Sequence, residues 1–196
     1  LICLLTISPY IYRNYNIFGV ITITKSGGYN LLKGNNPRAN VEGTPMFLSI
    51  QNVIPEVKPE LDKLVSRGPI KNYDLIQDKI LLDQAIKFIK VDPYNYIKLY
   101  FKKVFSFALI DFEADYKNYY SPLHIIPKII LGITTIIGII LSFRFKISAL
   151  NYISLYYFSN IGLFSIFFIL PRYSLSLLII QIILSLTLLK KIKPNL

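Results

Sequence analysis

The chain has 196 residues, a hydrophobic content of 53% and a formal net charge of +11. Its apolar residues concentrate after residue 123, which favours a membrane protein over a single soluble domain. All 11 acidic residues lie between Glu42 and Asp115, so the basic residues of the C-terminal third have no acidic neighbours in the sequence. This imbalance is typical of the ends of membrane helices and argues against a nucleic-acid partner.

Residues 1–12 predict the end of a transmembrane helix. They are apolar apart from Thr6, Ser8 and Pro9, and the run stops at Arg13, as expected where a helix reaches the lipid headgroups. A span requires ~20 apolar residues, and about half of that number is present. Because the chain also begins at Leu1 rather than Met, we expect it to be a fragment of a longer protein.

Residues 13–122 predict an extramembrane segment that is mixed but poor in β-structure. Residues 18–24 are rich in β-branched side chains, which predicts a short strand, and Lys25-Ser26-Gly27-Gly28 predicts a turn after it. The Gly-Asn-Asn-Pro sequence at 34–37 predicts a second turn. Prolines and a glycine interrupt residues 57–70, which predicts a loop with one helical turn.

Two amphipathic helices are predicted next. Residues 73–90 carry apolar side chains three to five positions apart, with charged residues between them. Asp92 is expected to cap a second helix that begins at Pro93. This helix could lie on the bilayer surface or dock on the helix before it. Its expected apolar face consists of Ile97, Phe101, Val104, Phe105 and Ala108, and its expected polar face of Lys98, Lys102 and Lys103.

Three hydrophobic runs in residues 123–196 predict three transmembrane helices and a short cytoplasmic tail. The runs cover residues 123–143, 148–170 and 173–189. Basic residues follow the first and the third run, and the positive-inside rule places both groups on the cytoplasmic side. We therefore expect a multi-pass α-helical protein of the inner (plasma) membrane, with residues 13–122 facing the periplasm or the cell exterior.

The sequence offers few residues for soluble-enzyme chemistry. It contains no Gly-rich phosphate loop, and Cys3 is the single cysteine, so neither an intrachain disulfide nor a Cys/His zinc site is expected. His124 stands where a span begins, which favours an interfacial, structural role over that of a catalytic base. Asp111, Glu113 and Asp115 alternate and could share a divalent cation. Because no further ligand is evident, a solvated turn beside the membrane is the favoured alternative.

Arg172 is the most informative charged residue, since it stands between two predicted spans on the same side as the large segment. Its planar guanidinium suits a phosphate or a carboxylate, although an arginine that snorkels to the headgroups is an equal alternative. Arg13 offers a second outward-facing cation at the end of the first span, and two such cations could bind a lipid phosphate.

Two sequence blocks carry a resemblance to a known family. Residues 9–19 read PYIYRNYNIFG and residues 27–37 read GGYNLLKGNNP, and Pro171-Arg172-Tyr173 follows in the same order as in that family. The chain resembles the polytopic glycosyltransferases of the GT-C class and is most similar to bacterial relatives of dolichyl-phosphate-mannose protein mannosyltransferases. The resemblance spans most of the chain.

The resemblance implies a transferase that passes a sugar from a polyprenyl-phosphate carrier to a lipid, glycan or protein acceptor at the outer face of the inner membrane. It places the catalytic acidic residue in a first outward loop that has no counterpart here, so the fragment alone is expected to be inactive. The residues expected by position to bind substrate are Arg172, Tyr173, Arg13, Asn14, Tyr29, Asn35 and Asn36.

A different class of function stays open at this point. The chain could be a non-enzymatic membrane assembly or transporter subunit that binds a partner through the outward segment. A transporter is expected to carry ionisable residues near the middle of its spans, whereas Lys128 is the one charge inside a predicted span and lies near its outer end. The absence of charges near the middle of the predicted spans favours the glycosyltransferase over a transporter subunit.

Overall fold

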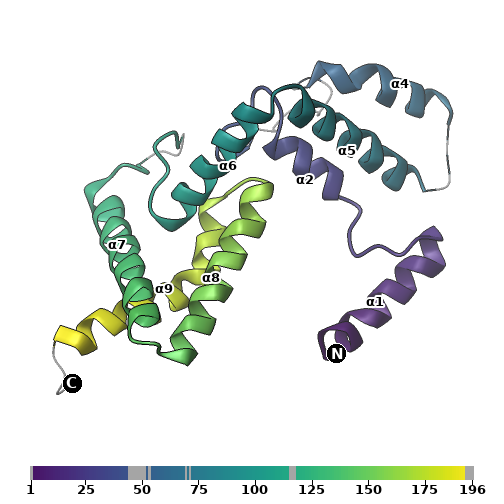
Figure 1. Cartoon of the computed structure of the whole chain (residues 1–196). Coiled ribbons are helices and arrows are strands. Elements are labelled where there is room, and N and C mark those ends of the chain that lie inside the picture. Colours follow the sequence, from purple (N-terminus) through teal and green to yellow (C-terminus); the bar gives the residue numbers. More distant parts are fainter. Residues whose placement is uncertain are drawn as a thin grey trace.

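The computed structural model describes residues 2–43, 52, 54–68, 70, 72–114 and 118–192. In these residues the protein is all-helical, with no β-strand, and Figure 1 shows α6 between a group formed by α2, α4 and α5 and a bundle formed by α7, α8 and α9. The helices are α1 (Ile2–Phe18), α2 (Gly27–Gly34), α4 (Lys58–Ser66), α5 (Tyr73–Val91), α6 (Pro93–Ala108), α7 (Pro122–Arg144), α8 (Ser148–Ile166) and α9 (Pro171–Ile192), with the 3-10 helix η1 (Pro55–Val57) before α4.

The strand predicted at residues 18–24 is wrong. Phe18 is the last residue of α1, and the chain then runs to α2 without regular structure. A β-branched segment forms a strand only where another strand pairs with it, and the described residues contain none. Side chains satisfy the backbone here instead, because Asn14 Nδ2 donates to the carbonyl of Thr22 at 2.8 Å.

The turn predicted at residues 25–28 is wrong in its second half, because Gly27 and Gly28 begin α2. The Asp78 carboxylate on α5 accepts hydrogen bonds from the backbone N–H groups of Gly28, at 2.9 Å, and Tyr29, at 2.8 Å. A side chain at Gly28 would overlap the backbone of α5, so glycine permits this close approach. The predicted turn at residues 34–37 is confirmed.

Residues 57–70 form more helix than expected. Pro55 and Pro59 lie in the first turns of η1 and α4, where the missing N–H of proline has no helical partner to lose. The prolines therefore start these helices rather than interrupt them. A hydrophobic cluster joins them to α2 and α5 and consists of Leu32, Ile54, Val57, Leu61, Leu81 and Ala85.

The two amphipathic helices are confirmed as α5 and α6, and Asp92 caps α6 by accepting from the Asn95 N–H at 3.2 Å. α6 packs mainly against α8 rather than α5. The assignment of its faces was only partly correct. Val104 and Ala108 pack against the core, whereas Lys103, expected on the polar face, is fully buried.

The described helices include one, α7, that is long and apolar enough to cross a membrane. Only 28% of its most apolar stretch is buried within the protein, unlike the core helix of a soluble domain. α8 and α9 remain predicted spans. The apolar part of α9, Tyr173–Thr187, is short, and α8 carries asparagine, serine and tyrosine side chains that lower its hydropathy.

Polar side chains are buried inside the α7–α9 bundle beside apolar ones such as Ile139, Ile161 and Leu184, and many other apolar side chains of these helices are exposed. Thr135 Oγ1 lies 3.2 Å from Ser185 Oγ, and Gln181 Nε2 donates to the Tyr157 hydroxyl at 2.9 Å. A side chain at Gly138 would overlap the backbone of Leu184, so α7 and α9 approach closely there. Small residues and interhelical hydrogen bonds are typical of contacts between helices in lipid.

Candidate functional site

The Asn35-Asn36 turn is fixed by its own side chains. Asn35 Nδ2 donates to the carbonyls of Leu31, at 3.0 Å, and Ile166, at 2.8 Å, so this amide ties the end of α2 to the end of α8. Asn36 Nδ2 donates to the Leu32 carbonyl at 2.8 Å. These amides satisfy carbonyls that the last turn of a helix leaves without partners.

The connection between α8 and α9, residues 167–170, packs directly on this turn. A side chain at Gly34 would overlap the carbonyl of Phe167, and the Ile169 N–H donates to the Val41 carbonyl at 2.9 Å. Lys33 Nζ lies 4.4 Å from the centre of the Phe168 ring. The Gly-Asn-Asn-Pro turn thus lies beside the segment that leads to Pro171-Arg172-Tyr173.

Lys103 joins these segments and was missed as a site residue. Its side chain is 0% exposed, and Nζ donates to the carbonyls of Gly34, at 2.8 Å, and Phe167, with Asn35 Oδ1 3.4 Å away. Burial lowers the pKa of Lys103 to about 7. One sequence signal could have found it: Leu99, Lys103 and Phe107 are spaced by four, so they share a helix face.

Two adjoining pockets lie along α6. The first is mainly apolar, has a volume of about 540 Å³ and is formed by α6 and the loop after it. The second, of about 480 Å³, lies towards the Asn36 turn and is more polar. Both are lined by Lys98, Lys102 and Glu113. The apolar pocket adds Tyr94, Ile97, Phe101, Phe105 and Phe112, and the polar pocket adds Asn36, Asn40, Asp92, Asn95 and Tyr96.

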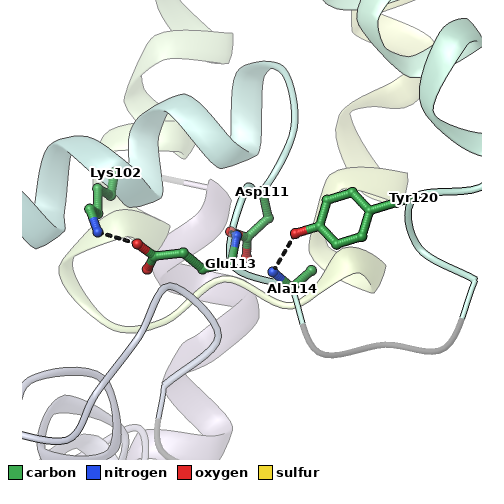
Figure 2. Close-up of polar contacts among 5 residues, drawn as sticks. All are labelled: Lys102, Asp111, Glu113, Ala114 and Tyr120. Atoms are coloured by element: carbon green, nitrogen blue, oxygen red, sulfur yellow. Dashed lines mark hydrogen bonds and ion pairs between the residues drawn. The ribbon is translucent and has the colours of Figure 1, made fainter.

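The loop at residues 110–114 forms one wall of the apolar pocket and is held by the contacts in Figure 2. Glu113 pairs with Lys102, and the Glu113 N–H donates to Asp111 Oδ1 at 2.9 Å. The Ala114 N–H donates to the Tyr120 hydroxyl at 3.0 Å. Asp111, which is 4% exposed, donates its own N–H to the hydroxyl of Tyr119.

A divalent-cation site in this loop remains a prediction. The described residues contain no group of three or more His, Cys, Asp or Glu side chains that could hold a metal, and Asp115 lies outside them. His124 has a structural contact, since its Nδ1 lies 2.8 Å from the Tyr119 carbonyl oxygen.

The predicted substrate-binding residues occupy different places. Arg13 is exposed on α1, and the buried Asn14 holds the segment after that helix. Tyr29 packs against the cluster between α2 and α5. The Tyr173 ring stacks on Phe164, with ring centres 5.4 Å apart.

Asn36, one of the predicted substrate-binding residues, lines the polar pocket on α6. Its neighbour Asn35 contacts Lys103 through Oδ1. Arg172 is the second residue of α9, and the position of its side chain lies outside what the structure describes. The site around α6 therefore adds residues that the sequence did not single out for binding, chiefly Lys98, Lys102 and Lys103.

The chain matches no protein-family model, no curated protein and no solved structure.

Proposed function

We propose that this chain is the C-terminal part of an integral membrane glycosyltransferase that moves a sugar from a polyprenyl-phosphate carrier to a lipid, glycan or protein acceptor. The observation that carries the proposal is the pair of adjoining pockets on α6, one polar and one apolar, with Lys98 and Lys102 lining both. A lipid-linked sugar has the same division, since its sugar and phosphate are polar and its prenyl chain is apolar. Each pocket also has a volume typical of small-molecule sites.

The two pockets suggest a role for each group. The sugar hydroxyls would meet the amides of Asn36 and Asn95 and the carboxylate of Asp92 in the polar pocket. The carrier phosphate would lie at Lys98 and Lys102, where the two pockets adjoin. In the reaction an acceptor oxygen attacks the anomeric carbon, the bond from that carbon to the phosphate oxygen breaks, and the polyprenyl phosphate departs with the bonding electrons.

The charge that develops on the departing phosphate is stabilised by cations already positioned around it. Lys98 supplies this stabilisation together with Lys102, whose charge is shared with Glu113. The resemblance also assigns Arg172 and Arg13 to the carrier phosphate, but Arg13 lines neither pocket. The resemblance assigns the proton acceptor to an acidic residue in an outward loop that has no counterpart in this chain. In this proposal the residues around α6 supply carrier binding.

The proposed topology has α7, α8 and α9 crossing the inner membrane, with residues 13–122 outside. Hydrogen bonds between the helices inside the bundle and the exposed apolar side chains on its outside support this placement of all three helices. Arg144 and Lys146 lie at the turn between α7 and α8, where the positive-inside rule favours the cytoplasm.

A photoreactive polyprenyl phosphate, with a diazirine on its prenyl chain, tests carrier binding by the purified chain in lipid nanodiscs. We expect cross-links to peptides from α6, competed by unlabelled polyprenyl phosphate and much less by the corresponding polyprenol. Lys98→Gln should reduce labelling because the phosphate loses a cation. The matched control is Lys87→Gln, which removes an exposed lysine of α5 that lines neither pocket. Equal competition by polyprenol, or equal labelling of the two variants, would contradict the phosphate site.

A further inference from the structure

One face of α6 exposes a row of large apolar side chains. Tyr94, Ile97, Phe101 and Phe105 are spaced by three or four residues, so they lie on one side of the helix. Ile97 is 57% exposed and Phe101 is 62% exposed. Phe112 extends the row from the loop, since its ring stacks on that of Phe105 with centres 5.6 Å apart. An apolar surface of this kind marks a site of contact with a partner or with a membrane.

The opposite face of α6 is already occupied by the protein. Lys103 and Phe107 are buried against α8 and the Asn35 turn, and the Tyr100 hydroxyl lies 3.4 Å from the carbonyl of Gly162 on α8. α6 is therefore fixed in orientation about its axis, and the aromatic row faces away from the core.

The depth of α6 along the bundle points to lipid as the occupant. Gly132 lies well inside the apolar helix α7, and a side chain there would overlap the carbonyl of Ala108 and the side chain of Leu109, at the end of α6. This close contact places the C-terminal end of α6 alongside the apolar stretch of α7. Figure 1 shows α6 slanting from the α2–α5 group towards the α7–α9 bundle.

The charged side chains beside the aromatic row also fit a position of α6 at the membrane. Lys98 and Lys102 flank the aromatic side chains on α6, and lysines at that place can reach phospholipid phosphates while aromatic rings occupy the acyl boundary. Two acidic residues of the loop after α6, Asp111 and Glu113, also line the apolar pocket, and Glu113 pairs with Lys102.

We propose that α6 inserts obliquely into the outer leaflet of the membrane that α7 crosses, with its aromatic row in contact with phospholipid chains and its C-terminal end deepest. Phe105 lies deeper than Phe101, and Tyr94 lies at the headgroups. The row is thus a lipid-contacting surface, and the apolar pocket that it lines opens to the leaflet rather than to water. This placement does not depend on sugar transfer.

The chain contains no tryptophan, so single-tryptophan variants report the depth of α6 without interference. Phe105→Trp, Phe101→Trp and Tyr94→Trp are reconstituted into vesicles of phosphatidylcholine and phosphatidylglycerol, with and without bromine atoms on the acyl chains. We expect loss of emission with brominated lipid to be largest for Phe105→Trp and smallest for Tyr94→Trp. Protection from aqueous acrylamide should follow the same order.

Val65→Trp is the matched control, because Val65 is an apolar residue of α4 that is also 57% exposed. Its emission should be quenched by acrylamide and not by brominated lipid. If Phe105→Trp and Phe101→Trp behave like Val65→Trp, the row faces water and the proposal is wrong. Protection from both quenchers would also overturn it, because the row would then be covered by protein, such as a second copy of the chain. Neither readout involves the sugar carrier, so the outcome is independent of the test of the proposed function.

Discussion

At the scale of the residue, Lys103 holds the candidate site together. It contacts the end of α2 through Gly34 and Asn35 and the connection before α9 through Phe167. The spacing of Leu99, Lys103 and Phe107 places Lys103 on a different face from its exposed neighbour Lys102, but it does not show which of the two lysines meets buried acceptors. Burial of a lysine depends on oxygen acceptors supplied by segments far away in the sequence, and no local pattern reveals them.

Replacing Lys103 by methionine tests this role, since methionine keeps the length of the side chain but donates no hydrogen bond. The buried oxygens at Gly34 and Phe167 would lose a donor, and we expect unfolding to become easier by roughly 2–4 kcal/mol. Lys102→Met is the control, and loss of its partly exposed ion pair should cost under about 1 kcal/mol. Thermal unfolding in detergent, followed by circular dichroism, measures both variants. Equal stability of the two would show that Lys103 does not hold the segments together.

The same variant has a defined pH dependence. The pKa of Lys103 in the folded protein is about 7, below the ordinary value of 10.5, so between these values the unfolded chain binds more protons than the folded one. The free energy of unfolding therefore gains a contribution that rises with pH in this window and is absent below it. The stability difference between the original chain and Lys103→Met should grow from pH 7 towards pH 10.

At the scale of the element, sequence patterns located the helices whose signals are local. α5 and α6 were predicted because their apolar spacing and the Asp92-Pro93 cap belong to the helices themselves. α2 was missed because its N-terminal cap is Asp78, 50 residues away from Gly28 in the sequence. The strand at residues 18–24 was predicted on composition alone, and composition does not supply a pairing partner.

The cap of α2 gives a test at this scale. Asp78→Asn removes the charge and leaves one acceptor oxygen for two backbone N–H groups, so we expect the start of α2 to lose about 1 kcal/mol of stability. Hydrogen exchange at the amides of residues 28–32 should speed up. Asp83→Asn, an exposed change on the same helix α5, should leave these amides unaffected. Unchanged exchange in Asp78→Asn would mean that packing on α5 alone holds α2.

At the scale of the whole molecule, the sequence located the apolar runs but not how they face one another. Gly132, Thr135, Gly138 and Ser142 lie on one face of α7 and are buried, whereas isoleucines cover its exposed side. Hydropathy along the chain reports the average of these two faces. It therefore predicts that α7 can span a membrane, but not which face of α7 packs against other helices. The meeting of the Asn35 turn with residues 167–170 is a contact between distant segments that no local pattern contains.

The arrangement of three spans is tested by cysteine labelling of a chain in which Cys3, its single cysteine, is replaced by serine. Ser66 on α4, Lys146 after α7 and Phe167 after α8 are exposed, so a cysteine at each can react with a membrane-impermeant maleimide. If α7 and α8 both cross, Ser66→Cys and Phe167→Cys should label from the outside and Lys146→Cys from the cytoplasm, because each crossing changes the side. Labelling of Phe167→Cys from the same side as Lys146→Cys would show that α8 does not cross. The Asn35 turn, which contacts the end of α8, and α6 would then lie on the cytoplasmic side, and the proposed outward carrier site would be wrong.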